Sequence, residues 1–326
     1  MRVAADLVPL HPPALLIAGP TASGKSALAL VVAERLGGTI INTDSMQVYR
    51  ELRVLTARPA PEEEARVPHR LYGVRPAAKA GSVAWWRGEA LAAMQAAHEG
   101  GRLPILTGGS GMYFAALTGG IADIPDPGPM ARAEARSLLA ELGPDALHAR
   151  LAAVDPATAA KLQPGDSQRI ARAWEVWRGT GTGLSAWQTR RTEPAPWEFT
   201  AIHLDPPRDE LRAAIACRFD AMAAAGALQE VEALLALNLD AALPAMRAHG
   251  VPELSAYLRG TLSLAEAAQR TELVTGQYTK RQTTWFRHHP LAQQTRTFTI
   301  HARLSGQEQF SESFWRDLFN FIQKLC

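Results

Sequence analysis

The sequence predicts an α/β fold in which helices surround a parallel sheet, with an additional all-helical domain inserted into it. Two observations carry this prediction. Short apolar runs of strand length alternate with longer segments whose apolar residues recur at helical spacing, which is the pattern of a doubly wound parallel sheet. Two proline-rich breaks also enclose an Ala-, Arg- and Leu-rich stretch without strand-like runs, which indicates a helical insertion.

The first strand is predicted over 14–18, and apolar residues at helical spacing follow over 26–36. Between them the chain reads Gly-Pro-Thr-Ala-Ser-Gly-Lys-Ser from Gly19 to Ser26. Two glycines at this spacing let the backbone curl so that its N–H groups point at a phosphate, and the helix that follows adds its positive N-terminal end. The segment predicts a phosphate-binding P-loop in a P-loop NTPase-like core, but it leaves open which phosphate ester binds.

Two further strand ends carry polar residues. A strand over 39–41 runs into Asn42-Thr-Asp-Ser45, and a strand over 103–106 runs into Thr107-Gly-Gly-Ser-Gly111. Because the carboxyl ends of parallel strands meet at one edge of a sheet, we expect the site there. The remaining elements of the core are predicted to be a strand over 199–204 and helices over 83–99, 207–224, 228–237 and 264–285.

The proline-rich breaks at 125–129 and 192–196 define the domains. We predict a catalytic core over 14–121 and 196–290, a helical insertion over 122–195 and a C-terminal tail over 291–326. From Ser311 the tail places apolar residues on one side of a helix, namely Phe314, Leu318, Phe321, Ile322 and Leu325. We expect this helix to dock on its own domain; binding to a partner is the alternative.

The bulk composition indicates an ordinary globular protein, since 47% of the 326 residues are hydrophobic and 20% are charged. The beginning of the chain lacks a basic patch with an apolar run, and no run of about 18 apolar residues occurs. We therefore expect neither secretion nor a membrane span. The two cysteines form no evident disulfide framework, which favours a reduced cytoplasmic context, and we take the protein to be a monomer. Cys217 and Cys326 match no metal-ligand spacing, so we expect both thiols to be inert.

The net charge of +2 is uninformative, but the distribution of charge is not. Between Arg247 and Arg303 the chain carries eight Lys or Arg residues, three acidic residues and four histidines. Such a basic segment is typical of a surface that binds a polyanion. The alternative is a solvated face that binds nothing.

Residues in and near the P-loop indicate the chemistry that it serves. Lys25 supplies a mobile positive charge to a phosphate, and the Ser26 hydroxyl suits Mg²⁺. A P-loop kinase also needs a strand that ends in a carboxylate, yet the strand over 103–106 ends without an acid. The nearest acid is Asp44 at the end of the second strand, which is either a cap for the following segment or a catalytic base.

Six segments in this order resemble the tRNA dimethylallyltransferase family, also called the tRNA isopentenyltransferases, and the similarity covers about residues 14 to 290. They are Gly19-Pro-Thr-Ala-Ser-Gly-Lys-Ser26, Asn42-Thr-Asp-Ser-Met-Gln-Val-Tyr49, Thr56-Ala-Arg-Pro59, Gly108-Gly-Ser-Gly-Met-Tyr-Phe114, Gln168-Arg-Ile-Ala-Arg172 and Lys280-Arg-Gln-Thr-Thr-Trp-Phe-Arg287.

The resemblance implies transfer of a dimethylallyl group from its diphosphate to the exocyclic amine of an adenosine beside the tRNA anticodon, with Mg²⁺ near Ser26. By this carry-over Asp44 and Thr21 are the catalytic residues, with an ionised Asp44 accepting the amine proton as the C–N bond forms. The implied diphosphate ligands are Gly19, Pro20, Thr21, Ala22, Ser23, Gly24, Lys25, Ser26 and Arg218.

The resemblance also implies a tRNA-binding set on the core, the insertion and the last core helix. Its members are Asp44, Ser45, Met46, Gln47, Ser110, Arg132, Gln168, Arg169, Ile170, Ala171, Arg172, Lys280, Arg281 and Arg287. Alternatives stay open for some residues near them. Thr21 and Ser110 could instead cap turns, and Trp285 could be a core residue. Arg58, a further candidate for a phosphate contact, and Arg218 could each form a surface salt bridge instead.

The sequence departs from the family pattern at Gly250-Val-Pro-Glu253, and at Ala214 and Gly276, where an arginine is frequent. Three other functions compete with tRNA prenylation. A prenyltransferase acting on free AMP needs neither the insertion nor the segment over 280–287. A small-molecule P-loop kinase lacks its strand-end carboxylate here, and a non-catalytic RNA-binding protein does not need a complete P-loop with Asp44.

Overall fold

The protein is described from a computed structural model, over residues 11–325. A sheet of parallel strands forms its centre, in the order β3-β2-β4-β1-β5-β6. The strands are β1 (Pro13–Ala18), β2 (Gly38–Asn42), β3 (His69–Arg70), β4 (Leu103–Gly108), β5 (Glu198–Leu204) and β6 (Thr297–Ile300). The parallel α/β class and the strands expected at 14–18, 39–41, 103–106 and 199–204 are thereby confirmed.

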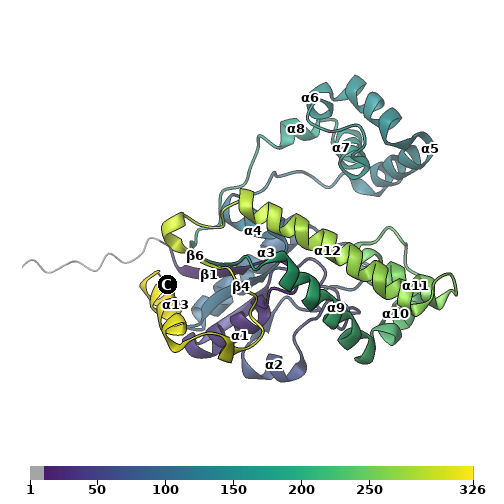
Figure 1. Ribbon diagram of the computed structural model, residues 1–326. Helices are drawn as coiled ribbons and strands as arrows, with labels where there is room; N and C mark the ends of the chain where they lie inside the picture. The colour runs from purple at the N-terminus through teal and green to yellow at the C-terminus, as the bar shows by residue number, and fades with distance from the viewer. Residues whose placement is uncertain (1–10, 326) are drawn as a thin grey trace, which may run out of the picture. The chain divides into compact units, whose positions relative to one another are not determined.

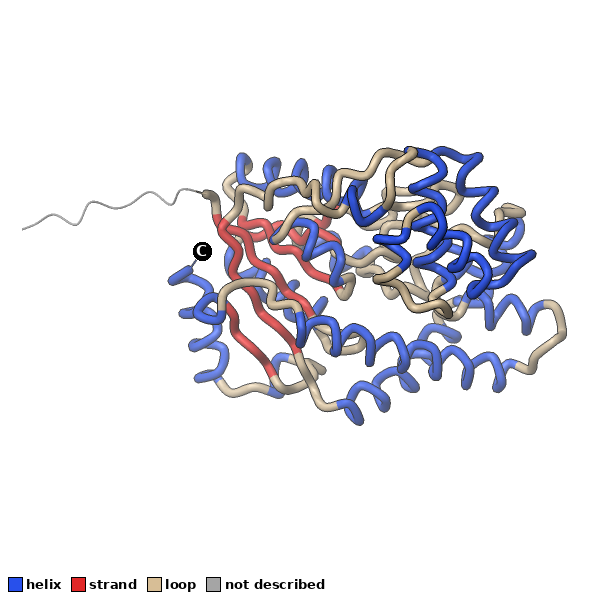
Figure 2. Tube along the Cα trace, turned by 90° about the horizontal axis from the view of Figure 1, so that it is seen from above, coloured by secondary structure: helices blue, strands red, loops and turns tan. Residues whose placement is uncertain are grey.

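Successive residues of the central strand β1 face opposite sides of the sheet, as the alternation of a strand requires. Leu15 and Ile17 pack with α1 (Lys25–Leu36) and α13 (Glu312–Leu325). Leu16 packs on the other face, which is covered by α3 (Val83–Glu99), α4 (Gly111–Thr118) and part of α12 (Leu264–His288). Helices therefore cover both faces of the sheet, whose strands lie side by side in Figure 2.

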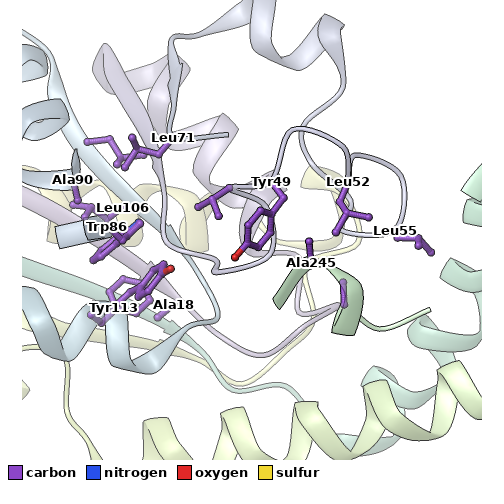
Figure 3. Close-up of a cluster of buried hydrophobic side chains, with 14 of the residues drawn as sticks. Ala18, Tyr49, Leu52, Leu55, Leu71, Trp86, Ala90, Leu106, Tyr113 and Ala245 are labelled. Atoms are coloured by element: carbon purple, nitrogen blue, oxygen red, sulfur yellow. The ribbon is translucent and has the colours of Figure 1, made fainter. Parts of the chain in front are cut away.

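The core on the α3 side includes large aromatic residues. Trp86 is fully buried and stacks on Tyr113 with ring centroids 4.2 Å apart; Figure 3 shows the two rings side by side. The Trp86 indole N–H donates to the carbonyl of Asn42 at the end of β2. This packing fixes the end of β2, and the polar segment over 43–45 follows directly.

Further helices of the first unit follow β5 along the chain. They are α9 (Arg208–Ala224), α10 (Ala227–Ala236) and α11 (Val251–Leu258), together with α12; the short α2 (Pro61–Arg66) comes earlier, before β3. The helices expected at 26–36, 83–99, 207–224, 228–237 and 264–285 are confirmed to within three residues.

Contacts divide the chain into two compact units, of which the second is Gly119–Pro194 and the first is the rest. The second unit covers nearly the same residues as the predicted insertion. It is helical, with α5 (Gly128–Val154), α6 (Pro156–Ala159), α7 (Ser167–Thr180) and α8 (Leu184–Trp187) around a small core of its own.

The chain after residue 290 adds an edge strand and a helix to the first unit. β6 pairs with β5, and α13 lies alongside α1 (Figure 1). Leu318 and Ile322 are fully buried, and Phe314 and Phe321 are partly buried. Docking of this helix on its own domain is thereby confirmed for the described side chains, which do not include that of Leu325.

Among residues 11–325, no helix is long and apolar enough to cross a membrane. Cys217 is a free, exposed thiol, whereas Cys326 lies outside the described residues.

Candidate active site

Three polar segments meet at one edge of the sheet because β2, β4 and β1 are neighbours in it. The P-loop follows β1, Asp44 follows β2, and Ser110 follows β4. The segments are also tied together, since the Ser110 N–H donates to the carbonyl of Thr43 at 3.2 Å. The polar residues at the three strand ends therefore lie together, as expected for a site at this edge of the sheet.

The P-loop is open toward a cavity of about 1100 Å³. Gly24 adopts a left-handed conformation, with φ of 89°, and leaves the N-terminus of α1 without a side-chain cap. The first N–H groups of a helix have no acceptor within the helix. Lys25 and Ser26 line the cavity at this end of α1, so the free amides and the helix dipole are available to an anion.

Lys25 and Arg218 form the positive side of this cavity. Burial lowers the pKa of Lys25 to about 8, although Asp44 opposes this effect and Arg218 adds to it. Burial also lowers the pKa of Arg218, again against the attraction of Asp44. Asp44 only partly offsets the cost of burying these two positive charges. A phosphate bound between them and the loop amides would supply further negative charge and would therefore be stabilised.

Asp44 makes the capping contact considered for it and, within residues 11–325, also keeps one carboxylate oxygen without a donor at the cavity. Its Oδ1 accepts the N–H of Met46 at 2.9 Å, which is the capping contact. Among the described residues no donor binds Oδ2, and Asp44 lines the cavity. The segment is held from both sides, because the Asp44 N–H donates to Asn42 and the Ser45 N–H donates to the Ser110 Oγ at 2.9 Å. One carboxylate oxygen thus fixes the loop while the other remains available for chemistry.

Gln282 on α12 joins the P-loop to the segment after β4. Its Oε1 accepts the N–H of Thr21 at 2.8 Å and the Thr21 hydroxyl at 3.1 Å, and its Nε2 donates to the Gly109 carbonyl at 2.9 Å. A backbone N–H and a carbonyl have fixed roles, so the orientation of the amide is determined. Gln282 is 4% exposed, and a Cβ at position 109 would come within 2.1 Å of its Nε2.

Gln282 was not among the predicted site residues, although the segment over 280–287 was singled out. Tyr278, one turn earlier on α12, lines the cavity and was not predicted either. Burial, followed by the nearby Asp44, raises the pKa of Tyr278 to about 12 even though hydrogen bonds with Ser110 and Gln282 lower it. Polar residues at 278 and 282 are spaced one helical turn apart, and this pair on the inner face of α12 was the available signal.

Gln47 and Arg58, both candidates near the P-loop, hold the backbone. The Gln47 Nε2 donates to the carbonyls of Thr56 and Ala57, both at 2.9 Å. Arg58 donates through Nη1 to the Arg50 carbonyl at 3.2 Å. Both residues line the cavity, but their contacts first of all maintain the loop over 44–58.

On α12 the three basic candidates and Trp285 differ in their surroundings. Lys280, Arg281 and Arg287 are exposed. Trp285 is half-buried, stacks on His289 at 4.4 Å and packs so closely on the backbone of residue 111 that a Cβ there would come within 2.3 Å. The core role considered for Trp285 is therefore the one that its contacts support.

The candidates in the second unit are also unequally exposed. Gln168 and Arg169 are exposed, while Ala171 and Arg172 are half-buried; Arg172 pairs with Glu175 at 3.1 Å and Arg132 pairs with Asp126. Ile170 is 0% exposed in the core of this unit. Its burial argues against the predicted contact between the Ile170 side chain and tRNA.

The departures from the family pattern have structural counterparts. Gly250 is the N-cap residue before α11, with φ of 96°, and its N–H donates to the Glu253 carboxylate at 3.0 Å, so this block caps a helix. Ala214 lines the cavity one turn before Arg218. At Gly276 an added Cβ would meet open space, with nothing within 4 Å. The fold described here does not need an arginine at either of the last two positions.

No group of three His, Cys, Asp or Glu side chains within residues 11–325 could hold a metal ion. A Mg²⁺ ion nevertheless suits the donor atoms that are present, since it keeps water and substrate phosphate oxygens as ligands and needs few from the protein. Ser26 is exposed at the cavity wall, where its hydroxyl could supply one such ligand.

Comparisons with known proteins agree on one family. The model of the IPP transferase family matches residues 47–289. The tRNA dimethylallyltransferase of Granulibacter bethesdensis is 65% identical over 95% of this chain and 98% of its own, and that of Gluconacetobacter diazotrophicus is 61% identical over 95% and 94%.

A solved structure, the tRNA isopentenylpyrophosphate transferase of Bacillus halodurans, is 30% identical and superposes with a TM-score of 0.66 over 96% of each chain. A eukaryotic dimethylallyltransferase superposes with a TM-score of 0.80 at 24% identity, over 97% of this chain and 80% of its own. With the P-loop, Asp44 and Ser110 assembled at the ends of three neighbouring strands, the chain belongs to the tRNA dimethylallyltransferase, or IPP transferase, family.

Proposed function

We propose that this protein transfers a dimethylallyl group from dimethylallyl diphosphate to the N6 amine of the adenosine adjacent to the anticodon of tRNA. The observation that carries the proposal is the place of Asp44. Its carboxylate lies next to the P-loop, on the wall of the same cavity as Lys25 and Arg218. The acid that a P-loop kinase carries at the end of a neighbouring strand is missing after β4. The relatives' activity, as their names state it, supports the same reaction.

The donor site is built from positive charge and an apolar wall. The diphosphate would lie against the backbone amides of residues 24–26, with Lys25 and Arg218 as its cations. Apolar side chains of α9 line the same cavity, among them Ile215, Phe219 and Met222. They offer the five-carbon chain a surface away from water, which favours binding by the hydrophobic effect.

The reaction exchanges one bond for another. The bond between the allylic carbon and the diphosphate oxygen breaks, the bond between that carbon and N6 forms, and N6 loses a proton. The loop amides, Lys25 and Arg218 stabilise the charge that grows on the diphosphate. Asp44 accepts this proton through the carboxylate oxygen that does not cap Met46. The proton moves as the C–N bond forms, because only then is the amine acidic enough for a carboxylate to deprotonate it.

Thr21 and Ser110 position the reactants in this proposal. The Thr21 hydroxyl lies in the P-loop and is oriented by Gln282. Ser110 accepts the N–H of Ser45 and keeps its own proton to donate, beside the Tyr278 hydroxyl. Thr21 would therefore act on the donor, and Ser110 on the acceptor base.

Mg²⁺ bound to the diphosphate, with the Ser26 hydroxyl as a protein ligand, would neutralise part of the leaving group's charge. The protein's own residues would hold the diphosphate and exclude water around it. Chelation of divalent metal is expected to reduce transfer, and it would also reduce pyrophosphate binding to the protein, which can be measured without catalysis.

An adenine stacked in an anticodon loop cannot reach Asp44, so the base must leave the stack at a cost of a few kcal/mol. Exposed cations and amides would offset this cost by binding the tRNA backbone. On the first unit these are Lys280, Arg281 and Arg287, and on the second unit Gln168 and Arg169. The adenosine itself would contact the segment over 44–47. We further propose that the enzyme acts as a cytoplasmic monomer.

A transfer assay tests the function against its rivals. The protein is incubated with labelled dimethylallyl diphosphate and Mg²⁺, together with unmodified tRNA or AMP as acceptor. We expect label in tRNA and none in AMP. Label in AMP alone would support the free-nucleotide prenyltransferase, and phosphoryl transfer from ATP to a small molecule without any prenyl transfer would support a kinase; either result contradicts the proposal.

A further inference from the structure

A short segment of the C-terminal tail, residues 302–305, runs directly against the P-loop. The Leu304 N–H donates to the Ser23 carbonyl at 3.0 Å, and Leu304 is 2% exposed. A Cβ at Gly24 would come within 2.0 Å of the Leu304 carbonyl oxygen. Gly24 is therefore required at this position for two reasons, its left-handed backbone and the approach of the tail.

The segment is held on both sides by ordered structure. Before it, β6 pairs with β5 as the edge strand of the sheet. After it, α13 packs on α1, where Arg35 lies over the ring of Phe319 at 4.4 Å. Figure 1 shows α13 and α1 side by side. The tail thus reaches the P-loop as part of the folded unit, although it lies beyond the residues that the family model matches.

Arg303 is the residue of this segment that lines the cavity together with Thr21, Lys25 and Arg218. Its Nε donates to the Ala22 carbonyl at 2.9 Å, and its backbone N–H donates to the Glu210 carboxylate at 3.1 Å. Within residues 11–325, nothing accepts a hydrogen bond from its two Nη groups. The guanidinium is therefore oriented by the loop while two of its nitrogens remain available to a ligand.

We propose that Arg303 is a further diphosphate-binding residue, supplied to the P-loop by the C-terminal tail. This inference rests on the proposed function, because it assumes that the cavity holds a prenyl diphosphate. Such a ligand carries several negative charges, and the planar guanidinium binds phosphate oxygens through two N–H groups at once. Arg303 would add a cation from the tail to those that α1 and α9 supply.

The geometry separates Arg303 from other arginines of the tail. Arg296 pairs with Glu198, and Arg316 is 70% exposed on α13 beside Asp317. Neither lines the cavity. Arg316 is consequently a matched control, since its replacement removes the same charge from the same tail without altering the P-loop.

The test measures binding of inorganic pyrophosphate with Mg²⁺ to the full chain by titration calorimetry, at several salt concentrations. We expect R303Q to bind at least about 10-fold more weakly than the unaltered protein, the effect of losing hydrogen bonds to a charged group. R303Q should also show a smaller dependence of affinity on salt, because one ionic contact is missing. R303K should lose less affinity and keep the salt dependence, and R316Q should match the unaltered protein.

Transfer assays complete the test. In R303Q the KM for dimethylallyl diphosphate should rise about 10-fold while the KM for tRNA stays unchanged. A purely structural Arg303 would leave the salt dependence of pyrophosphate binding unaltered in R303Q, and this result would overturn the proposal. If the unaltered protein transfers the prenyl group to tRNA but R303Q binds pyrophosphate as tightly as R316Q, Arg303 is not a ligand. Failure of the unaltered protein to bind pyrophosphate would contradict the donor site itself.

Discussion

The residues at the strand ends and the candidates on α7 of the second unit are held in different ways. Asp44, Thr21 and Ser110 are partly or fully buried, and each is fixed by hydrogen bonds to another segment or to its own loop. Gln168 and Arg169 are exposed, and Arg169 pairs with Asp166 at 3.5 Å. Chemistry requires reacting groups in one geometry before substrate arrives, whereas contacts with a phosphate backbone tolerate mobile side chains. Substitutions in the two regions should therefore fail in different ways.

The largest effect is expected for Asp44→Asn. The amide oxygen can still cap Met46, so the loop should keep its shape, but the side chain can no longer accept the N6 proton. We expect kcat to fall by at least about 10²-fold with little change in tRNA affinity. Single-turnover transfer and tRNA binding check this, and an unchanged rate would exclude Asp44 as the base.

A smaller loss of turnover is expected for Gln282→Met, which keeps much of the volume of the side chain but removes its hydrogen bonds to Thr21 and Gly109. The P-loop and the segment after β4 would lose their link, so kcat should fall about 10-fold. Thr284→Val, at an exposed position of the same helix, is the control. If T284V and Q282M have equal kcat values, Gln282 does not position the loop.

The lowered pKa of Lys25 predicts a pH dependence for donor binding. Below pH 8 the ammonium is present in the free protein, and above pH 8 it is lost, so pyrophosphate binding must then be coupled to uptake of a proton. Affinity should therefore fall as the pH increases beyond about 8, by up to about 10-fold per unit. Calorimetry on Lys25→Arg is the control. Since a guanidinium stays charged at these pH values, this variant should not show the loss of affinity above pH 8. If K25R loses affinity over the same pH range, a group other than Lys25 causes the pH dependence.

The smallest effects are expected in the tRNA-binding region. Arg169→Ala and Lys280→Ala should each weaken tRNA binding by a few-fold and reduce the slope of log affinity against log salt by about one ionic contact. Neither should change the single-turnover rate at saturating tRNA. Ile170→Val, which trims the buried core, should leave the salt slope intact. A slope unchanged in R169A would remove Arg169 from the set.

Much of this molecule could be predicted from local sequence. The strands before Gly19, Asn42 and Thr107 have apolar runs that end in polar residues, and the parallel order of the sheet brings those ends together. Gln282 could not be placed in this way, because its contact with Thr21 joins residues 261 positions apart. Both residue types are ordinary in their own segments, and only packing of α12 against the sheet reveals the pair.

The tail illustrates a second limit. The apolar spacing of α13 predicted a docked helix, since a helix with one apolar face must bury it. Nothing in the spacing shows that the segment before this helix lies on the P-loop, because that depends on β6 joining the edge of the sheet. The burial of Ile170 was missed for a related reason. Resemblance to a family motif does not show which of its residues face solvent and which pack in the core of the helical unit.

Identification of the modified nucleoside is the most decisive test of the proposed reaction. Unmodified tRNA is incubated with the unaltered protein, dimethylallyl diphosphate and Mg²⁺, then digested to nucleosides and to oligonucleotides for mass spectrometry. We expect one dimethylallyl group, on N6 of the adenosine next to the anticodon, with release of an equal amount of diphosphate. A prenyl group on another atom or nucleotide, or release of inorganic phosphate in place of diphosphate, would contradict the proposed reaction.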